Sequence, residues 1–177
     1  MTARAARLIV GFVLVVVAIV AIDAPANAYN DANCKKHDTL NYYQIGAYAT
    51  ASNNAVDAWI AAPVALAFSP SSNPDIFIDL GGYGSSGYDG ITYLRCGTGT
   101  QVDPSESYYN GYYTSDYGTT ARKQVMVHEL GHAMGLGHAG SAMCSGQPIM
   151  YKSSDRWFIC GHQNPQADDN DGINHIY

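Results

Sequence analysis

Residues 127–138 have the sequence Val-His-Glu-Leu-Gly-His-Ala-Met-Gly-Leu-Gly-His, and His128 and His132 lie four residues apart within it. On an α-helix a spacing of four advances about 400°, so both imidazoles leave the same face one turn apart. Two imidazoles in this arrangement can bind one metal ion, a pairing that is typical of zinc sites. The stretch therefore predicts a helix that carries two metal ligands.

The same stretch supplies a base and a third ligand. Glu129 lies about 100° round the helix from His128, too far round to be the natural third ligand but placed to take a proton from a water on the metal. Gly135 permits the left-handed conformation that ends a helix, which lets the chain turn back and bring His138 to the same metal. Zinc with three protein nitrogens and an open fourth position is the catalytic form of a zinc site. The alternative is that the histidines fall at this spacing by chance.

The pattern resembles that of a known family of zinc proteases. Residues 128–138 fit the metzincin signature HExxHxxGxxH, and residues 147–151, Gln-Pro-Ile-Met-Tyr, are similar to the Met-turn of that family. Within the metzincins the chain is most similar to the matrixins, and the resemblance touches most of residues 40–177. Shorter similarities lie in residues 55–59, 74–78 and 168–173, which resemble the matrixins' first helix, middle strand and closing helix.

This resemblance implies a role for each residue of the motif. His128, His132 and His138 would bind one catalytic zinc ion, and Met150 would form the floor of the site. Glu129 would act as the general base toward a zinc-bound water and later as the proton donor to the leaving amine. The reaction implied is hydrolysis of a peptide bond, with the metal polarising the scissile carbonyl and stabilising the oxyanion.

Three features depart from the matrixin pattern. Matrixins commonly carry an inhibitory propeptide whose Cys caps the zinc, but Cys96 follows strands of the catalytic domain, and we expect it to be half of a disulfide. No His lies between His37 and His128, so the second, structural zinc of many matrixins is expected to be absent. The Pro-containing wall of the family's main specificity pocket is missing from residues 151–157. Substrate preference therefore stays open.

Two segments of the chain are candidates for binding calcium as a second metal. Asp168, Asp169 and Asp171 lack the spacing of an EF-hand loop, and acidic residues at a helix N-terminus are a simpler explanation for them. The resemblance to matrixins implies that Asp168 or Asp169 pairs with the mature N-terminal ammonium. Calcium bound by Asp and backbone oxygens of residues 81–90 is kept as an alternative.

Hydrophobic and turn patterns predict an α+β fold with a small mixed, twisted sheet and a long active-site helix. By resemblance to metzincins, a C-terminal helix lies below the zinc cleft. Residues 97–118 are predicted to be a polar connection, whose Tyr cluster is either a platform for polymers or partner proteins or a loop packed on its own domain. Strands are predicted at 40–45, 65–68, 75–80 and 91–95, and helices at 51–62, 119–135 and from 166 or 168 to 177.

The N-terminus predicts export. Two arginines precede the apolar residues 8–22, and a small-x-small sequence follows at 26–28, which is the order of a signal peptide and its cleavage site. An uncleaved membrane anchor is disfavoured because the apolar run is shorter than the roughly 20 residues that cross a bilayer. We expect residues 1–28 to be removed, and residues 29–177 to form a single secreted, extracellular zinc metalloprotease domain without stable membrane insertion.

The length and net charge of the chain limit the kinds of molecule that it is expected to bind. The chain has 177 residues, 14% of them charged, and a formal net charge of −6. This length fits one globular domain. An acidic chain has no electrostatic basis for a broad nucleic-acid interface. We therefore expect a monomer that acts on a protein or peptide substrate and binds no nucleic acid.

All four cysteines, Cys34, Cys96, Cys144 and Cys160, follow the predicted signal peptide. An even number of cysteines in an exported chain favours disulfides, and the sequence alone allows three pairings. We favour Cys34 with Cys96 and Cys144 with Cys160, because the second bond would close a short loop around Met150. A cysteine zinc site is disfavoured because no two cysteines have C-x-x-C spacing.

Two functions from different classes follow from these observations. The first is a secreted zinc-dependent endopeptidase in which Glu129 activates a zinc-bound water. The second is a catalytically idle metzincin-like module for binding or adhesion. The presence of Glu129 favours the enzyme, because a decayed site is expected to lose its base first. A zinc hydrolase of non-peptide amides is a third option that the site alone does not exclude.

Overall fold

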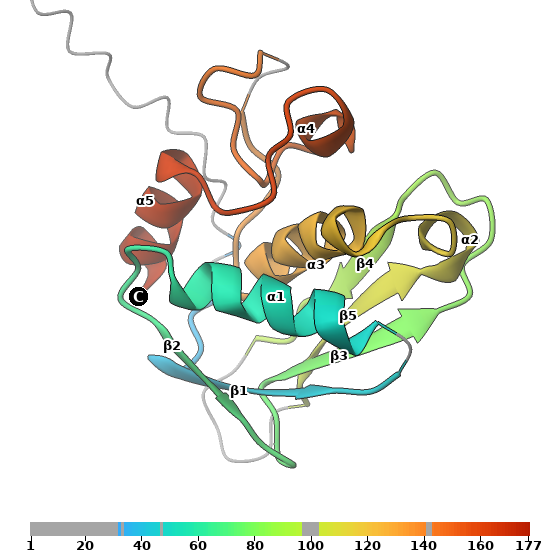
Figure 1. The fold of residues 1–177 in the computed structure, drawn as a ribbon. Coiled ribbons are helices and arrows are strands. Elements are labelled where there is room, and N and C mark those ends of the chain that lie inside the picture. The colour runs from blue at the N-terminus through green and yellow to red at the C-terminus, as the bar shows by residue number, and fades with distance from the viewer. Residues whose placement is uncertain (1–31, 33, 47, 97–102, 141–142) are drawn as a thin grey trace, which may run out of the picture.

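The computed structural model describes residues 32, 34–46, 48–96, 103–140 and 143–177. These residues form one sheet and a set of helices that are labelled in Figure 1. The strands are β1 (Thr39–Gln44), β2 (Ala67–Pro70), β3 (Ile76–Gly81), β4 (Gly90–Tyr93) and β5 (Ser105–Asn110). The helices are α1 (Ala49–Ile60), α2 (Gly111–Thr114), α3 (Thr119–Ala133), α4 (Asp155–Phe158) and α5 (Ala167–Ile176).

The sheet is mixed and has the strand order β2-β1-β3-β5-β4. β1 pairs in parallel with β2 and β3, and β3 pairs in parallel with β5. β4 is the antiparallel strand at one edge. β2, at the other edge, contains Pro70, which an edge strand tolerates because its outer row of amides needs no partner. The α+β fold with a small mixed sheet is confirmed.

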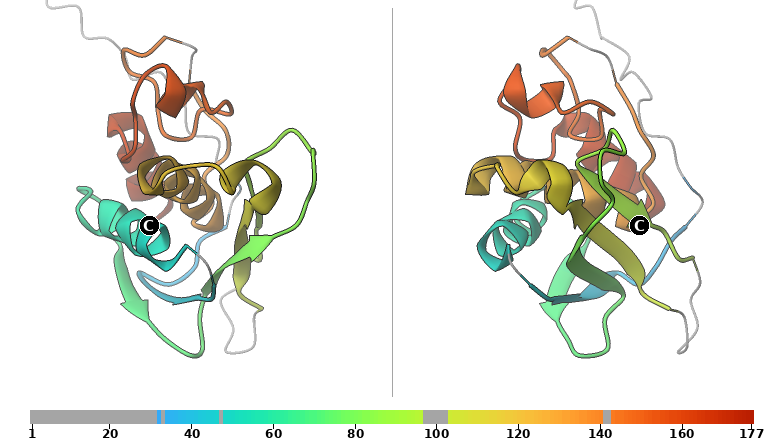
Figure 2. Two further views of the ribbon diagram at one scale, coloured as in Figure 1. Left: turned by 45° about the vertical axis from the view of Figure 1, so that its right-hand side comes forward. Right: turned by 90° about the vertical axis from the view of Figure 1, so that its right-hand side faces the viewer.

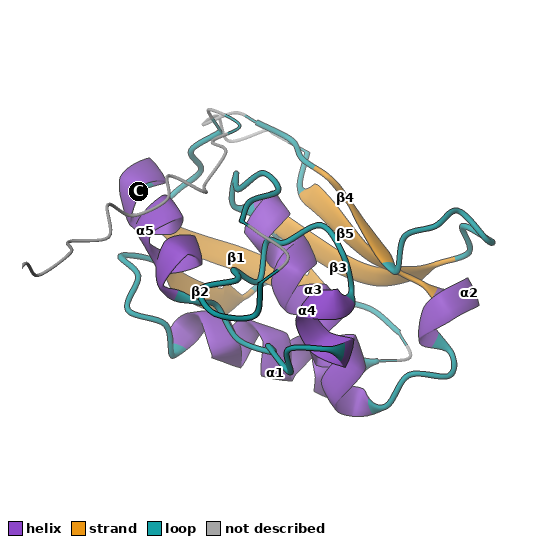
Figure 3. Cartoon of the chain, turned by 90° about the horizontal axis from the view of Figure 1, so that it is seen from above, coloured by secondary structure: helices purple, strands orange, loops and turns teal. Residues whose placement is uncertain are grey.

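The long helices α1 and α3 pack on each other and cover one face of the sheet (Figure 3). Trp59 of α1 is fully buried and donates its indole N–H to the carbonyl of Val127 at 3.0 Å. This bond joins α1 to the turn of α3 that begins the zinc motif. The core between sheet and helices contains Leu40, Ile76, Ile78, Val56, Trp59, Val125, Met126 and Leu130.

The C-terminal segment lies on the side of α3 away from β1, as both views in Figure 2 show in orange and red. α5 falls within the predicted closing helix, and α3 ends two residues before the predicted boundary at Gly135. α1 and β2 are each displaced by two residues from their predicted ranges. The one-turn helices α2 and α4 were not predicted, because four residues are too few to show a helical period.

The prediction that residues 97–118 form a connection throughout is wrong, because residues 105–110 are β5, an inner strand of the sheet. Its buried face is polar, so the sequence shows no apolar alternation there. Ser107 shares a hydrogen bond with Thr92 at 3.0 Å, and the hydroxyl of Tyr109 shares one with Ser52 at 3.1 Å. These bonds satisfy hydroxyls that would otherwise be costly to bury.

The tyrosines of this region therefore have different environments. Tyr109 belongs to the core, whereas the side chain of Tyr112 is 60% exposed. Tyr108 packs edge-on against Tyr83 and Tyr93, which places it in an aromatic group on the other side of β5. The cluster is thus neither one surface platform nor one packed loop.

Two disulfides join distant parts of the chain, Cys34 to Cys96 and Cys144 to Cys160. This is the pairing that the sequence favours. The predicted signal peptide, residues 1–28, lies outside the described residues. No helix within the described part of the chain is long and apolar enough to cross a membrane.

Candidate metal centre

Three imidazoles from α3 and the loop after it converge on one point. The Nε2 atom of His128 lies 3.0 Å from that of His132 and 3.3 Å from that of His138, and the remaining distance is 3.2 Å. A tetrahedral zinc ion with Zn–N bonds of about 2.0 Å separates its nitrogen ligands by about 3.3 Å. The three imidazoles fit one zinc ion. Within the described ranges, no other group of three or more His, Cys, Asp or Glu side chains has metal-binding spacing.

Backbone carbonyls fix the orientation of two of these rings. The Nδ1 atom of His128 lies 2.8 Å from the carbonyl oxygen of Ile149, and that of His132 lies 2.7 Å from the carbonyl oxygen of Leu136. A carbonyl oxygen only accepts, so each Nδ1 carries the ring proton. The Nε2 lone pairs are therefore left for a metal, which is the usual arrangement of metal-binding histidines.

Electrostatics keep the three rings neutral. Burial lowers the pKa of His128 well below its usual value and the pKa of His132 to about 4. Burial also lowers the pKa of His138, and the positive charge of Arg156 acts in the same direction on all three rings. Because metal binding requires the neutral imidazole, the site is prepared for a cation at neutral pH.

The turn after α3 brings the third histidine into place. Gly135 has a φ of +104°, the left-handed conformation that the sequence predicts for it. The amide of Leu136 then donates to the carbonyl of Gly131 at 2.9 Å, which closes the end of the helix. Further on, the amide of Ala139 donates to the carbonyl of Met150 at 3.1 Å. The loop that carries His138 is thus tied to the Met-turn.

Met150 is buried against the active-site helix. A methyl group at Gly131 would overlap the Met150 sulfur, so the glycine inside the zinc motif provides the space in which Met150 packs. The same turn holds His128 through the carbonyl of Ile149. Met150 and the motif therefore form one packed unit.

A carboxylate from α5 holds the Met-turn, and the sequence does not predict this contact. Asp169 accepts hydrogen bonds from the amides of Ile149 at 2.7 Å, Met150 at 3.1 Å and Gln166 at 2.7 Å. Burial raises the pKa of Asp169 to about 6, and these three donors oppose the rise. Both carboxylate oxygens thus bind backbone amides. The N-terminal ammonium that the resemblance pairs with Asp168 or Asp169 lies outside the described residues.

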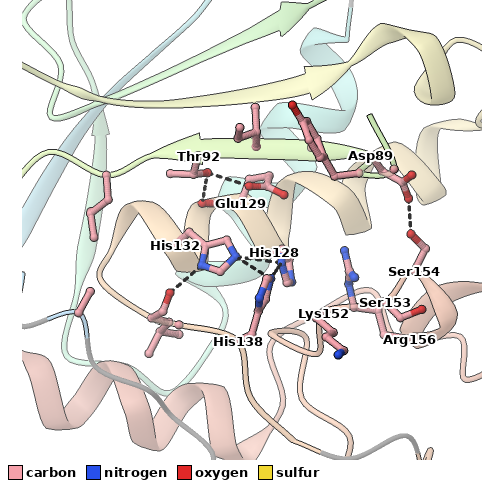
Figure 4. Close-up of a pocket in the computed structure, with 18 residues that line it drawn as sticks. Asp89, Thr92, His128, Glu129, His132, His138, Lys152, Ser153, Ser154 and Arg156 are labelled. Carbon is pink, nitrogen blue, oxygen red and sulfur yellow. Dashed lines mark hydrogen bonds between the residues drawn. The ribbon is translucent and has the colours of Figure 1, made fainter. Parts of the chain in front are cut away.

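Glu129 lies in the same cavity as the three histidines. Its side chain is buried, and the hydroxyl of Thr92 on β4 donates to its Oε2 at 2.9 Å (Figure 4). Burial raises the pKa of Glu129 to about 7, against the lowering effect of the Thr92 bond. A carboxyl group with a pKa near neutrality can both accept and return a proton. The sequence identifies Glu129 but gives no signal for Thr92.

The cavity has a volume of about 690 Å³ and runs between two walls. One wall is the segment from Gly87 to Thr92, and the other is the segment from Lys152 to Arg156. Ser154 donates a hydrogen bond to Asp89, which joins the two walls at one end (Figure 4). A cavity of this volume can hold side chains of a peptide.

The loop proposed as a calcium site is organised by a side-chain amide. Asn110 donates through Nδ2 to the carbonyls of Gly84 and Tyr88 at 2.9 and 3.0 Å. Two backbone oxygens of the loop therefore already have a hydrogen-bond donor. Calcium binding by this loop stays a prediction.

Three neutral imidazoles and a buried carboxylate in one cavity are typical of zinc metallopeptidases. The comparison with protein families agrees with this class. The sequence model of the matrixin family matches residues 49–177, and the chain belongs to that family. A comparison with curated proteins gave no significant match.

Proposed function

We propose that the protein is a secreted endopeptidase in which Glu129 is the general base. The observation that carries the proposal is the convergence of three Nε2 atoms, with Glu129 lining the same cavity. The burial of Glu129 favours the same role, because it brings the pKa of the carboxyl group to about 7. A module that only binds a partner would need no base at this position.

When bound, zinc supplies a Lewis acid that polarises the substrate carbonyl and increases the acidity of water. Glu129 takes the proton of the attacking water on its carboxylate and passes it to the nitrogen of the leaving amine. Thr92 keeps that carboxylate in place through its bond to Oε2. The carbonyls of Ile149 and Leu136 keep His128 and His132 oriented throughout.

We further propose that residues 1–28 are removed and that residues 29–177 act outside the cell as one monomeric domain. Two disulfides support an oxidising compartment, where such bonds form and persist. Mass spectrometry of the protein collected from the culture medium tests the cleavage after Ala28. Light scattering of the same sample tests the monomer.

Incubation of residues 29–177 with a mixed peptide library tests the enzymatic function. We expect internal cleavages that stop when a chelator removes the metal and return when zinc is added. Binding of zinc without any cleavage would support the idle binding module instead. Cleavage of non-peptide amides alone would support the third option.

A further inference from the structure

A buried cation lines the same cavity as Glu129. Arg156, in α4, is only 4% exposed, yet its side chain is one of those that line the cavity (Figure 4). The positive charge of Arg156 and the negative charge of Glu129 affect each other's pKa, which places the two groups in one electrostatic environment. The zinc motif gives no reason for a cation here.

The neighbours of Arg156 orient it but do not neutralise it. Its Nη1 donates to the carbonyl of Tyr151 at 3.0 Å. With the amide of Gln124 turned so that its oxygen faces Arg156, that oxygen accepts from Nε and Nη2. Both acceptors are neutral. Of the five guanidinium N–H groups, one on each terminal nitrogen has no partner among the described residues.

No carboxylate of the described residues forms an ion pair with Arg156. Among the described residues, the single ion pair with nitrogen and oxygen within 4.0 Å joins Lys35 and Asp38. Asp89, the other acidic residue of the cavity, accepts from Ser154 and from the hydroxyl of Tyr117. Burial lowers the pKa of Arg156 to about 10, with longer-range carboxylates acting against it, so the group is charged at neutral pH.

A buried charge without a counter-ion is costly, and it normally has a paired anion. A guanidinium presents its N–H groups in one plane, and two of them together match the two oxygens of a carboxylate. Lys152, on the same wall of the cavity, adds a second positive charge. These features call for an anionic ligand beside the reacting bond.

We propose that Arg156 binds a carboxylate of the peptide substrate next to the scissile bond and so selects acidic peptides. This inference rests on the proposed peptidase function. The carboxylate has two sources, the side chain of an Asp or Glu near the scissile bond or the C-terminus of a short peptide. In either case the Arg156 fork receives two oxygens while Tyr151 and Gln124 hold its remaining N–H groups.

Matched peptides test the proposal and separate the two sources. One series places Glu or Gln at each position flanking the cleaved bond, and a second series compares free with amidated C-termini. We expect kcat/KM for the carboxylate member of one series to exceed that for its neutral partner by about 10- to 100-fold. Equal cleavage of all pairs would overturn the proposal while leaving the peptidase function intact. No cleavage of any peptide would overturn both.

Substitutions show which residue is responsible for the preference for the Glu peptide over the Gln peptide. In Arg156→Met, the ratio of kcat/KM for the Glu peptide to kcat/KM for the Gln peptide should fall close to one. In Lys152→Gln, most of this preference for the Glu peptide should remain. Arg122→Met is the matched control, because Arg122 also donates to backbone carbonyls and stacks on Tyr48, but it lies outside the cavity lining. It should leave the ratio unchanged. A ratio that persists in Arg156→Met would contradict the assignment.

A binding measurement covers the case in which Arg156→Met does not fold. The Glu129→Gln protein keeps Arg156, and calorimetry can compare its affinity for the matched Glu and Gln peptides without turnover. We expect the Glu129→Gln protein to bind the Glu peptide more tightly than the Gln peptide. Adding Arg156→Lys to the Glu129→Gln protein should reduce this difference in affinity, because lysine lacks the planar fork. Equal affinity for the two peptides would overturn the proposal.

Discussion

The two halves of the metal centre are held in place by different means. His128 and His132 take their relative position from the backbone of α3, a local structure. His138 and Met150 lie outside regular elements and depend on contacts from distant parts of the chain. These contacts are the Asp169 carboxylate, the Cys144–Cys160 disulfide and the bond between Ala139 and Met150. We call α3 with His128 and His132 the helical half of the centre, and His138 and Met150 the loop half. The helical half is therefore expected to withstand changes that release the loop half.

The largest effect is expected from Glu129, the proposed base, which belongs to the helical half. Glu129→Gln keeps the shape of the side chain but removes its ability to take a proton. We expect kcat to fall by about 10²- to 10⁴-fold, with zinc content unchanged. Peptide cleavage and metal analysis on the same sample check both. Cleavage near the wild-type rate would remove Glu129 from the mechanism.

Removing one zinc ligand from each half compares how much each half contributes to zinc affinity. His138→Ala removes the loop ligand, and we expect zinc affinity to fall by more than about 100-fold, beyond the loss usual for a residue that only orients a ligand. His132→Ala is the matched variant in the helix and should lose as much. Competition with a fluorescent chelator measures both affinities. Unchanged zinc affinity in His138→Ala would show that the helix alone holds the metal.

The disulfide near the Met-turn supports the loop half of the metal centre. Replacing Cys144 and Cys160 by Ser opens a link with a sequence separation of 16, which should lower the free energy of unfolding by about 3 kcal/mol. We also expect faster zinc loss to a chelator and a smaller effect on cleavage when zinc is in excess.

The Cys34–Cys96 bond gives the control, because it closes a longer loop with a separation of 62. Replacing Cys34 and Cys96 by Ser should destabilise the protein at least as much, but release zinc more slowly than the Cys144/Cys160 variant. If both variants had equal stability and lost zinc at equal rates, the Cys144–Cys160 bond near Met150 would have no special role in holding the metal.

A smaller effect is expected from Asp169 in α5, whose carboxylate accepts hydrogen bonds from the Met-turn. Asp169→Asn leaves one carbonyl oxygen but sets an NH₂ group against a backbone donor, which should lower the free energy of unfolding by about 1–3 kcal/mol. Asp171→Asn is the matched control on the same helix, where the side chain is exposed. Chemical denaturation measures both. Equal stability of the two variants would mean that Asp169 does not hold the Met-turn.

The helical half was predictable from the sequence because its geometry is local. The spacing of His128 and His132 fixes their common face, and Gly135 marks the end of the helix. The roles of Met150 and His138 came from the family pattern as much as from physical argument. Both belong to segments whose positions depend on partners far along the chain.

The parts that were not predicted share a physical cause. β5 has a buried face of serines and a tyrosine whose hydroxyls find partners only in the folded protein, so its sequence lacks an apolar period. Asp169, Thr92 and Arg156 act through contacts across large sequence separations. A polar residue that is buried by the fold has the same sequence signal as one that faces water. Only the three-dimensional arrangement separates the two.

The most direct test of this metal centre is the X-ray absorption spectrum at the zinc edge of the zinc-loaded protein. In the proposed centre, one helix and one loop bring three imidazoles to a single metal and leave a position open for water. We expect three imidazole nitrogens and one oxygen, with Zn–N distances of about 2.0–2.1 Å. Sulfur ligands, four imidazoles or only two imidazoles would contradict it.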